Sequence, residues 1–207
     1  MDSLKSNEQK NKEDSESIKV ILIGNSGTGK TSLIAISAGN VFDSGMTSTT
    51  SFSFIRTKII INKKEYNLDI WDTIGQEKFR SMTQLFVKES KIVILVYDIT
   101  NRVSFESLSF WKKMIDNMIK DSPVIGIVGN KLDLYEHEQV HEKELSEYAK
   151  SLGVKYLITS AKNDNISFSK FLEELLYDYL KKSPGGRLES FSLEEATTPK
   201  KEKKNCC

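Results

Sequence analysis

Cysteine is nearly absent from this sequence: its 207 residues include only two, Cys206 and Cys207, which are adjacent. Adjacent cysteines cannot cross-link a folded core, and His137 and His141 are the only histidines that could add to them as metal ligands. A structural disulfide framework is therefore excluded, and the ligands of a four-coordinate zinc site are missing. The two histidines flank a polar stretch, and we expect them to be ordinary surface residues.

Long apolar runs and an excess of one charge are also missing. The longest apolar run, residues 92–97, has the length of a strand, whereas a membrane-spanning helix needs about 18 apolar residues or more. The first residues are polar, so we expect no secretory signal. Lys and Arg number 30 against 29 Asp and Glu, a balance that argues against electrostatic binding of nucleic acid. The composition predicts a cytosolic globular protein.

The distribution of apolar residues predicts one domain between two tails. Residues 1–17 contain almost no large apolar side chains, so we expect a disordered N-terminal extension. Residues 183–207 begin with Ser-Pro-Gly-Gly and show no periodicity, which predicts a flexible tail. The single globular domain is expected to occupy residues 18–182, a length that can bury a sizeable core.

Strand-like and helix-like patterns alternate through this domain. Short apolar or β-branched runs predict strands at residues 18–24, 52–62, 65–71, 91–99, 123–130 and 154–160. Amphipathic windows predict helices at residues 30–38, 76–89, 104–119, 141–152 and 165–182. The second and third strands are close enough in sequence to form a hairpin. We predict an α/β fold: a mostly parallel six-stranded sheet with one antiparallel edge strand and helices on both faces.

The first predicted strand leads into a phosphate-binding motif. Residues Gly24-Asn25-Ser26-Gly27-Thr28-Gly29-Lys30-Thr31 fit the phosphate-loop pattern. Glycines let successive backbone N–H groups curl around phosphate oxygens, and the following helix adds its positive end. Lys30 would reach the outer phosphates, and the Thr31 hydroxyl would ligate Mg²⁺. Because a strand precedes the motif and a helix follows it, the motif predicts a nucleoside triphosphate site.

Further polar residues follow the other predicted strands, at the sheet edge where open α/β sheets bind ligands. They are Asp72-Thr73, Asp98, Asn130-Lys131-Leu132-Asp133 and Ser160-Ala161-Lys162. The Asp133 carboxylate would accept hydrogen bonds from the N1–H and 2-amino groups of guanine. Adenine lacks both donors and would leave Asp133 buried without a partner, which favours guanine by a factor on the order of a thousand or more.

At these motifs the chain resembles the small GTPases of the Ras superfamily, and specifically the Rab branch. The features shared with Rabs are Asp69-Ile70-Trp71, Lys78-Phe79-Arg80-Ser81-Met82-Thr83, Leu95-Val96-Tyr97-Asp98-Ile99-Thr100 and the Cys-Cys pair. The similarity covers residues 18–182, essentially without gaps. It implies a single P-loop G domain that binds GTP or GDP with Mg²⁺ and hydrolyses GTP, slowly unless an activating protein assists.

The resemblance also implies a catalytic role for each matching position. Gln76 would orient the attacking water, assisted by Lys30 and by Thr49, which meets the γ-phosphate. Thr50 is the alternative to Thr49 if the loop is shifted by one residue. The implied Mg²⁺ ligands are Thr31, Thr49 and Asp72.

The implied nucleotide contacts extend over all of these loops. Phe42 would stack on the base, Lys131 would lie along it, and the Gly75 N–H would meet the γ-phosphate. Asn130 would tie its own loop, residues 130–133, here called the base loop, to the phosphate loop. The full set is Asn25, Ser26, Gly27, Thr28, Gly29, Lys30, Thr31, Ser32, Phe42, Thr49, Gly75, Asn130, Lys131, Asp133, Ser160, Ala161 and Lys162.

Two regions depart from the Rab pattern. Where Rabs usually read Ile-Gly-Val-Asp-Phe, this chain reads Thr-Ser-Phe-Ser-Phe at residues 50–54, so the effectors of known Rabs cannot be transferred to it. Ile74 stands where the family nearly always has alanine, and we hypothesise that it slows intrinsic hydrolysis without preventing nucleotide binding. Phe54, Trp71 and Phe86 match the aromatic trio that Rabs present to effectors, although packing within the fold would also explain them.

The C-terminal cysteines match the Rab signal for lipidation. The resemblance implies a geranylgeranyl group on both Cys206 and Cys207, added with an escort protein, and two lipid chains give stable anchoring where one is marginal. Four lysines, Lys200, Lys201, Lys203 and Lys204, would add attraction to an anionic surface. We expect a monomer on the cytoplasmic face of an intracellular or plasma membrane, cycling with the cytosol. Its expected partners are an exchange factor, an activating protein, a dissociation inhibitor and effectors.

The sequence leaves one alternative to a hydrolysing switch in vesicle traffic. A GTP-binding membrane-recruitment scaffold with negligible hydrolysis is kept open by Ile74, whereas Gln76 and Thr49 argue against it. A P-loop ATPase or nucleoside kinase would need an adenine site or a lid, and neither pattern is present.

Overall fold

The computed structural model describes residues 17–39, 53–73, 80–164 and 166–183 of the chain. In order, the elements are β1 (Ile18–Ile23), α1 (Lys30–Ser37), β2 (Ser53–Ile61), β3 (Lys64–Asp72), α2 (Arg80–Val87), β4 (Ile92–Asp98), α3 (Arg102–Glu106), α4 (Leu108–Met118), β5 (Val124–Asn130), the 3₁₀ helix η2 (Leu132–His137), α5 (Glu142–Leu152), β6 (Lys155–Ile158) and α6 (Ser167–Lys182). Apart from Ser17 and Ser183, the two predicted tails lie outside the described residues.

Six strands form one sheet in the order β2-β3-β1-β4-β5-β6. Only the β2–β3 pair is antiparallel, joined by a turn in which Asn62 and Lys63 have positive φ. The other neighbours are parallel, from β3–β1 through β5–β6. The predicted mostly parallel sheet with one antiparallel edge strand is confirmed.

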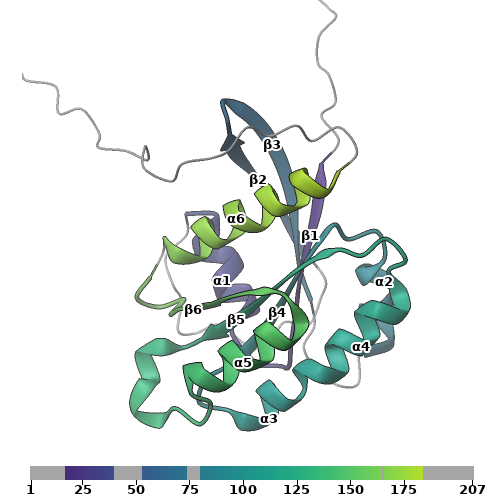
Figure 1. Cartoon of the computed structure of the whole chain (residues 1–207). Coiled ribbons are helices and arrows are strands. Elements are labelled where there is room, and N and C mark those ends of the chain that lie inside the picture. The colour runs from purple at the N-terminus through teal and green to yellow at the C-terminus, as the bar shows by residue number, and fades with distance from the viewer. Residues whose placement is uncertain (1–16, 40–52, 74–79, 165, 184–207) are drawn as a thin grey trace, which may run out of the picture.

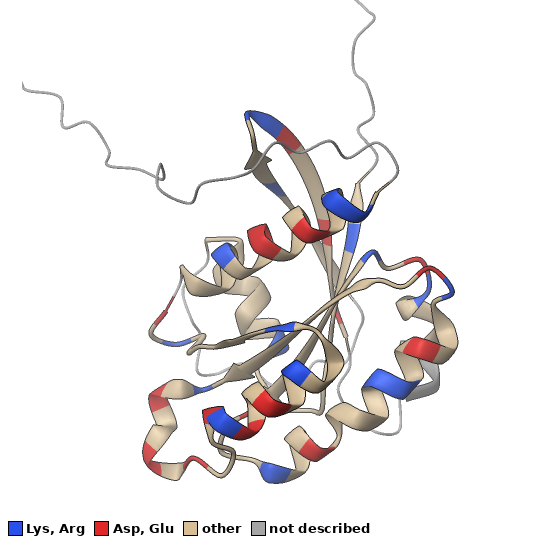
Figure 2. Ribbon diagram, viewed as in Figure 1, with Lys and Arg blue, Asp and Glu red and all other residues tan. Residues whose placement is uncertain are grey.

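Helices cover both faces of the sheet, as predicted (Figure 1). On one face α1 and α6 pack over alternate strand residues such as Val20 and Ile94. On the other face α2, α4 and α5 pack over the intervening residues such as Ile21 and Leu95. Strand β4 is buried along its whole length because both of its faces are covered. Figure 2 shows most of the charged residues on helices, loops and the hairpin. Strand β5 holds none, and the one charged residue of β4 is Asp98 at its end.

Two details of the helices differ from the prediction. The helix predicted at residues 104–119 is two helices, α3 and α4, which meet at Ser107. Asn101 starts α3 earlier than expected because its side chain accepts a hydrogen bond from the Ser104 N–H, as N-cap residues do. The helix η2 was not predicted, since its six residues are too few to show a helical period. No helix in the described part of the chain is long and apolar enough to span a membrane.

The carboxyl ends of the parallel strands meet at one edge of the sheet. Strand β4 ends at Asp98 and β5 ends at Asn130, and these two residues are paired in register. The loop after β1 and the loop after β6 open at the same edge, so four segments that are far apart in the sequence come together there.

Candidate nucleotide-binding site

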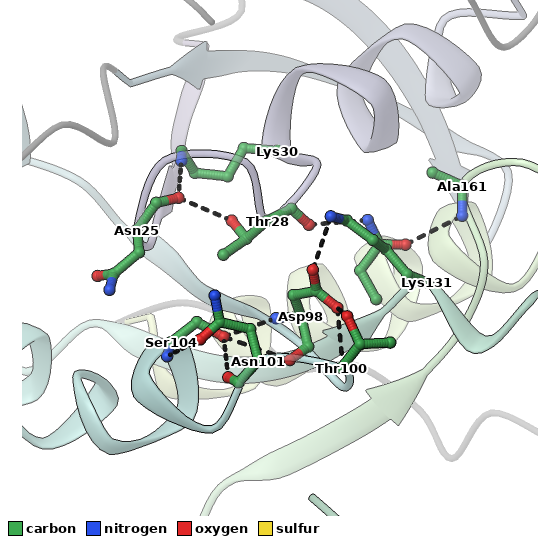
Figure 3. Close-up of polar contacts among 10 residues, drawn as sticks. Asn25, Thr28, Lys30, Asp98, Thr100, Asn101, Ser104, Lys131 and Ala161 are labelled. Atoms are coloured by element: carbon green, nitrogen blue, oxygen red, sulfur yellow. Dashed lines mark hydrogen bonds and ion pairs between the residues drawn. The ribbon is translucent and has the colours of Figure 1, made fainter. Parts of the chain in front are cut away.

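The loop between β1 and α1 closes around the ammonium group of Lys30. The Lys30 Nζ donates hydrogen bonds to the carbonyl oxygens of Gly24, at 3.0 Å, and of Asn25, at 2.9 Å. Figure 3 shows the bond to Asn25. The Asn25 carbonyl also accepts from the Thr28 hydroxyl at 3.0 Å. Gly29 has a φ of 89°, a left-handed conformation that glycine adopts without strain. The loop therefore holds a cation at the N-terminus of α1.

Lys30 is 5% exposed, and this burial lowers the pKa of its ammonium group. Desolvation lowers the pKa of Lys30 to about 8, opposed by the attraction of the Asp72 carboxylate. An oligophosphate beside the ammonium group would favour its charged form and raise the pKa again. The group is thus suited to bind a strongly anionic ligand.

A hydroxyl and a carboxylate stand together beside this loop. The Thr31 Oγ1 donates to Asp72 Oδ2 at 2.7 Å, and Asp72 is 3% exposed at the end of β3. The next residue, Thr73, donates to the Leu22 carbonyl of β1 at 2.7 Å, which fixes the end of β3. Two hard oxygen ligands are a set that Mg²⁺ takes when phosphates and water supply the rest. In the described part of the chain, no cluster of three or more His, Cys, Asp or Glu forms a metal site.

Asn130, the last residue of β5, joins three loops through its side-chain amide. Its Nδ2 donates to the Thr28 carbonyl in the phosphate loop at 2.9 Å, and its Oδ1 accepts from the Ala161 N–H at 3.0 Å. Gly29 lies so close that a Cβ there would be 2.2 Å from Asn130 Nδ2. The contact that the resemblance implies for Asn130 is present, across 102 residues of sequence.

The residues after Asn130 are held by contacts with two other strand ends. Lys131 has a φ of 71°, and its Nζ lies 2.6 Å from Asp98 Oδ2. Asp98 Oδ1 accepts from both the N–H and the hydroxyl of Thr100, at 2.9 and 2.7 Å, so the carboxylate is fixed (Figure 3). Asp133 Oδ1 accepts from the Ser160 hydroxyl at 2.5 Å. This contact fixes a carboxylate at the edge where the resemblance places the base.

The remaining predicted site residues divide into two groups. Ser26 and Gly27 are exposed at the tip of the phosphate loop, Ser32 lies in the first turn of α1, and the Lys162 N–H donates to the Ser160 hydroxyl at 3.2 Å. The others lie outside the described residues: Phe42, Thr49, Gly75, Gln76, Cys206 and Cys207, together with Thr50 and Ile74.

Two features of the site were not found from the sequence. The sequence places Asp98 only at the end of a strand, and nothing in it pairs Asp98 with Lys131. The side chain of Asn25 leaves the phosphate loop toward α4, where it accepts a hydrogen bond from Trp111 Nε1 at 3.0 Å. No sequence pattern signals a contact between residues 86 positions apart.

The aromatic residues Phe54 and Phe86 each contact Trp71, the residue before Asp72 in β3. Phe54 stacks on Trp71 with ring centroids 4.9 Å apart, and Trp71 meets Phe86 at 5.6 Å. Phe54 remains 49% exposed. The three rings therefore form one partly exposed apolar surface across β2, β3 and α2.

A phosphate loop, a hydroxyl–carboxylate pair and a base-side loop at the carboxyl edge of this sheet define a P-loop nucleotide-binding domain. Comparison with known proteins agrees: the model of the Ras family matches residues 19–181. Human Ras-related protein Rab-21 is 39% identical over 166 residues, 80% of this chain and 72% of its own. Human Ras-related protein Rab-30 is 38% identical over 149 residues, 72% of this chain and 73% of its own. A Rab-21 of Geodia cydonium is 38% identical over 164 residues, 79% of this chain and 69% of its own.

The chain belongs to the Ras family of small GTPases and, within it, to the Rab branch. It is therefore a GTP hydrolase of a family that acts in vesicle traffic and associates with intracellular membranes.

Proposed function

We propose that this protein binds GDP and GTP with Mg²⁺ at the carboxyl edge of its sheet and hydrolyses GTP to GDP and phosphate. It would act as a membrane-anchored switch in vesicle traffic. The observation that carries the proposal is the Asn130 amide, which joins the phosphate loop, the base loop and the loop after β6 into one unit. A ligand that spans all three loops needs a phosphate chain at one end and a base at the other.

The arrangement around Lys30 supports binding of the phosphate groups of the nucleotide. Backbone N–H groups at the start of α1 and the positive end of that helix favour phosphate oxygens. Lys30 would exchange its two carbonyl partners for phosphate oxygens, which compensate its buried charge better than neutral carbonyls do. Thr31 and Asp72 would hold Mg²⁺, and the ion, when bound, neutralises charge that develops on the phosphates.

The base end is supported by Asp133 and Lys131. A carboxylate held at this edge would accept two hydrogen bonds from guanine, and none from the corresponding edge of adenine. The ion pair between Lys131 and Asp98 would keep the aliphatic part of the lysine side chain along the base.

The hydrolysis step rests on residues supplied by the family resemblance. Gln76 would orient a water molecule for in-line attack on the γ-phosphorus, and the bond from that phosphorus to the β–γ bridging oxygen would break. The bridging oxygen leaves on GDP, and the proton of the water goes to the released phosphate. Lys30 would stabilise the charge on the leaving oxygen, while Thr49 and Gly75 would contact the γ-phosphate.

The proposed switch also needs attachment to a membrane and protein partners. Geranylgeranyl groups on Cys206 and Cys207 would anchor the protein to the cytoplasmic face of a membrane. The surface of Phe54, Trp71 and Phe86 would meet effectors in the GTP state, because it combines an exposed ring with two partly covered ones. An exchange factor, an activating protein and a dissociation inhibitor would regulate the cycle.

Single-turnover phosphate release from protein loaded with GTP and Mg²⁺ tests the proposal. We expect slow release that falls further in Gln76→Leu, and poor loading by ATP. Release that is absent and unchanged by Gln76→Leu would instead favour the recruitment scaffold without hydrolysis. Equal loading by ATP and GTP would show that the role given to Asp133 is wrong.

A matched variant isolates the base contact. Asp133→Asn should lose guanine selectivity, whereas Asp116→Asn removes the same charge from the exposed side of α4, where Asp116 pairs with Lys112 at 2.6 Å. An equal loss of selectivity in both variants would attribute the effect to net charge rather than to a contact with the base.

A further inference from the structure

The side chain of Asn25 connects the phosphate loop to the α3–α4 helices. Its Oδ1 accepts from Trp111 Nε1 at 3.0 Å, and its Nδ2 donates to Ser107 Oγ at 3.0 Å. Ser107 in turn donates to the Val103 carbonyl at 2.7 Å. Trp111 is 1% exposed and packs in the core between α4 and the sheet. The amide therefore has two partners, one of which belongs to a rigidly packed ring.

The main chain of the same residue holds the phosphate loop in shape. The Asn25 carbonyl accepts from Lys30 and from Thr28, as described above. The Asn25 backbone therefore forms hydrogen bonds within the phosphate loop, whereas its side chain forms them with α3–α4 outside the loop. If α4 shifted, the Asn25 side chain would move with it, and so would the Asn25 carbonyl that orients Lys30.

These contacts close a ring around the site, and Figure 3 shows the part of it that runs from Asn25 and Thr28 through Lys131 and Asp98 to Ser104. The phosphate loop contacts the base loop through Asn130, and the base loop contacts the end of β4 through Lys131 and Asp98. The backbone N–H of Asp98 donates to the Ser104 hydroxyl in α3 at 3.0 Å. The contacts of Asn25 with Ser107 and Trp111 complete the circuit from α3–α4 back to the phosphate loop. The phosphate loop is therefore held at two places. Near its start Asn25 contacts α3–α4, and near its end Thr28 contacts Asn130 of the base loop.

We propose that Asn25 is a positioning residue for nucleotide retention. Its side-chain amide fixes the start of the phosphate loop to α4, so that the phosphate-binding backbone is already in place when the nucleotide arrives. The position of α4 then helps to set how fast nucleotide leaves. This inference rests on the proposed binding of guanine nucleotide by the phosphate loop.

GDP release from full-length protein tests the inference. Asn25→Ala removes both contacts, and Trp111→Phe removes the N–H donor while keeping an aromatic ring in the core. We expect each to release GDP several-fold to about tenfold faster, tenfold corresponding to about 1.4 kcal/mol. Because both act through the same hydrogen bond, the double variant should release GDP no faster than Asn25→Ala alone.

A matched pair of serines gives the control. Ser107→Ala removes a hydroxyl that contacts both Asn25 and a helix carbonyl. Ser109→Ala removes an exposed hydroxyl that contacts only the Glu106 carbonyl, at 2.9 Å, in the same helical segment. Release should quicken in Ser107→Ala and stay at the wild-type rate in Ser109→Ala. Equal rates in these two variants would overturn the role of the Asn25 contact.

Fluorescence separates positioning from a loss of helix packing. In a Trp71→Phe background, Trp111 is the sole tryptophan, and its indole N–H donates to Asn25. Asn25→Ala should therefore shift the emission of Trp111, while the far-UV circular dichroism of the protein keeps its helical signal. Additive effects of Asn25→Ala and Trp111→Phe, in protein that still binds GDP, would refute the inference and leave the proposed function standing. If the wild type binds no GDP, the proposed function itself fails.

Discussion

Gly29→Ala is the sharpest test of how the site is assembled. A Cβ at this position would lie 2.2 Å from Asn130 Nδ2, so the amide would have to move. The movement breaks the hydrogen bonds from Asn130 to the Thr28 carbonyl and from the Ala161 N–H to Asn130, at 2.9 and 3.0 Å. All three loops depend on these two bonds.

The loss of folding free energy expected for Gly29→Ala is the sum of two terms. An alanine at a φ of 89° costs about 1 kcal/mol or slightly more for the left-handed backbone. Two hydrogen bonds lost to Asn130 add about 1 kcal/mol each, for a total of about 3 kcal/mol. In a chain of this size that lowers the melting temperature by roughly 6–12 °C.

Gly153→Ala is the matched control for the backbone term. Gly153 ends α5 with a φ of 65°, and a Cβ there meets no atom within 4 Å. It should cost only about 1 kcal/mol, or about 2–4 °C, and leave GDP release unchanged. Thermal unfolding by circular dichroism at saturating GDP measures the stability, and release of labelled GDP measures retention.

The comparison of Gly29→Ala with Gly153→Ala also defines the result that would contradict this reasoning. Gly29→Ala should release GDP about thirtyfold faster than Gly153→Ala, the factor that corresponds to about 2 kcal/mol. If both variants melt at the same temperature and retain GDP equally, Asn130 does not hold the phosphate loop in the way described.

Three further predictions concern individual charges. Asp133→Asn should weaken GDP binding by about a hundredfold or more, because charge-assisted hydrogen bonds to the base are lost; equal affinity in fluorescence titration would contradict this. Asp98→Asn keeps an oxygen for Thr100 but removes the charge opposite Lys131, and should quicken GDP release by a few-fold, since a partly exposed ion pair contributes about 1 kcal/mol at most. Because burial lowers the pKa of Lys30 to about 8 and phosphate binding favours the charged form, GDP affinity should fall as pH rises above that value, by up to about tenfold per pH unit. Isothermal titration should show this slope in the wild type and not in Lys30→Met.

The pKa of Lys30 has a second consequence, for the protein without nucleotide. The folded pKa of about 8 lies below the usual lysine value of 10.5, so the unfolded chain binds more protons between these two values. The free energy of unfolding should therefore rise with pH across that window, and the rise should be missing in Lys30→Met.

The sequence by itself determined the strands, most of the helices and the loops that carry the chemistry. Strands such as β4 are unbroken apolar runs, and the phosphate loop is a local pattern of glycines and one lysine, so short stretches of chain hold the necessary information. The helix η2 and the break at Ser107 are not predicted by the sequence pattern. At both places the chain has similar local conformations available, and contacts with neighbouring elements select one of them.

Only the tertiary structure decided which side chains meet across the site. Lys131 pairs with Asp98 and Trp111 contacts Asn25, each from a different strand end or helix, whereas the contact of Asn130 with the phosphate loop was expected from the family resemblance. The crossover connections of a parallel sheet separate such residues by tens of positions, and no periodicity in the sequence extends that far. Their pairing follows from the strand order and register, which place the ends of β1, β4 and β5 side by side. The motifs are therefore local properties of the chain, whereas the ring that holds them together is a property of the packed sheet and helices.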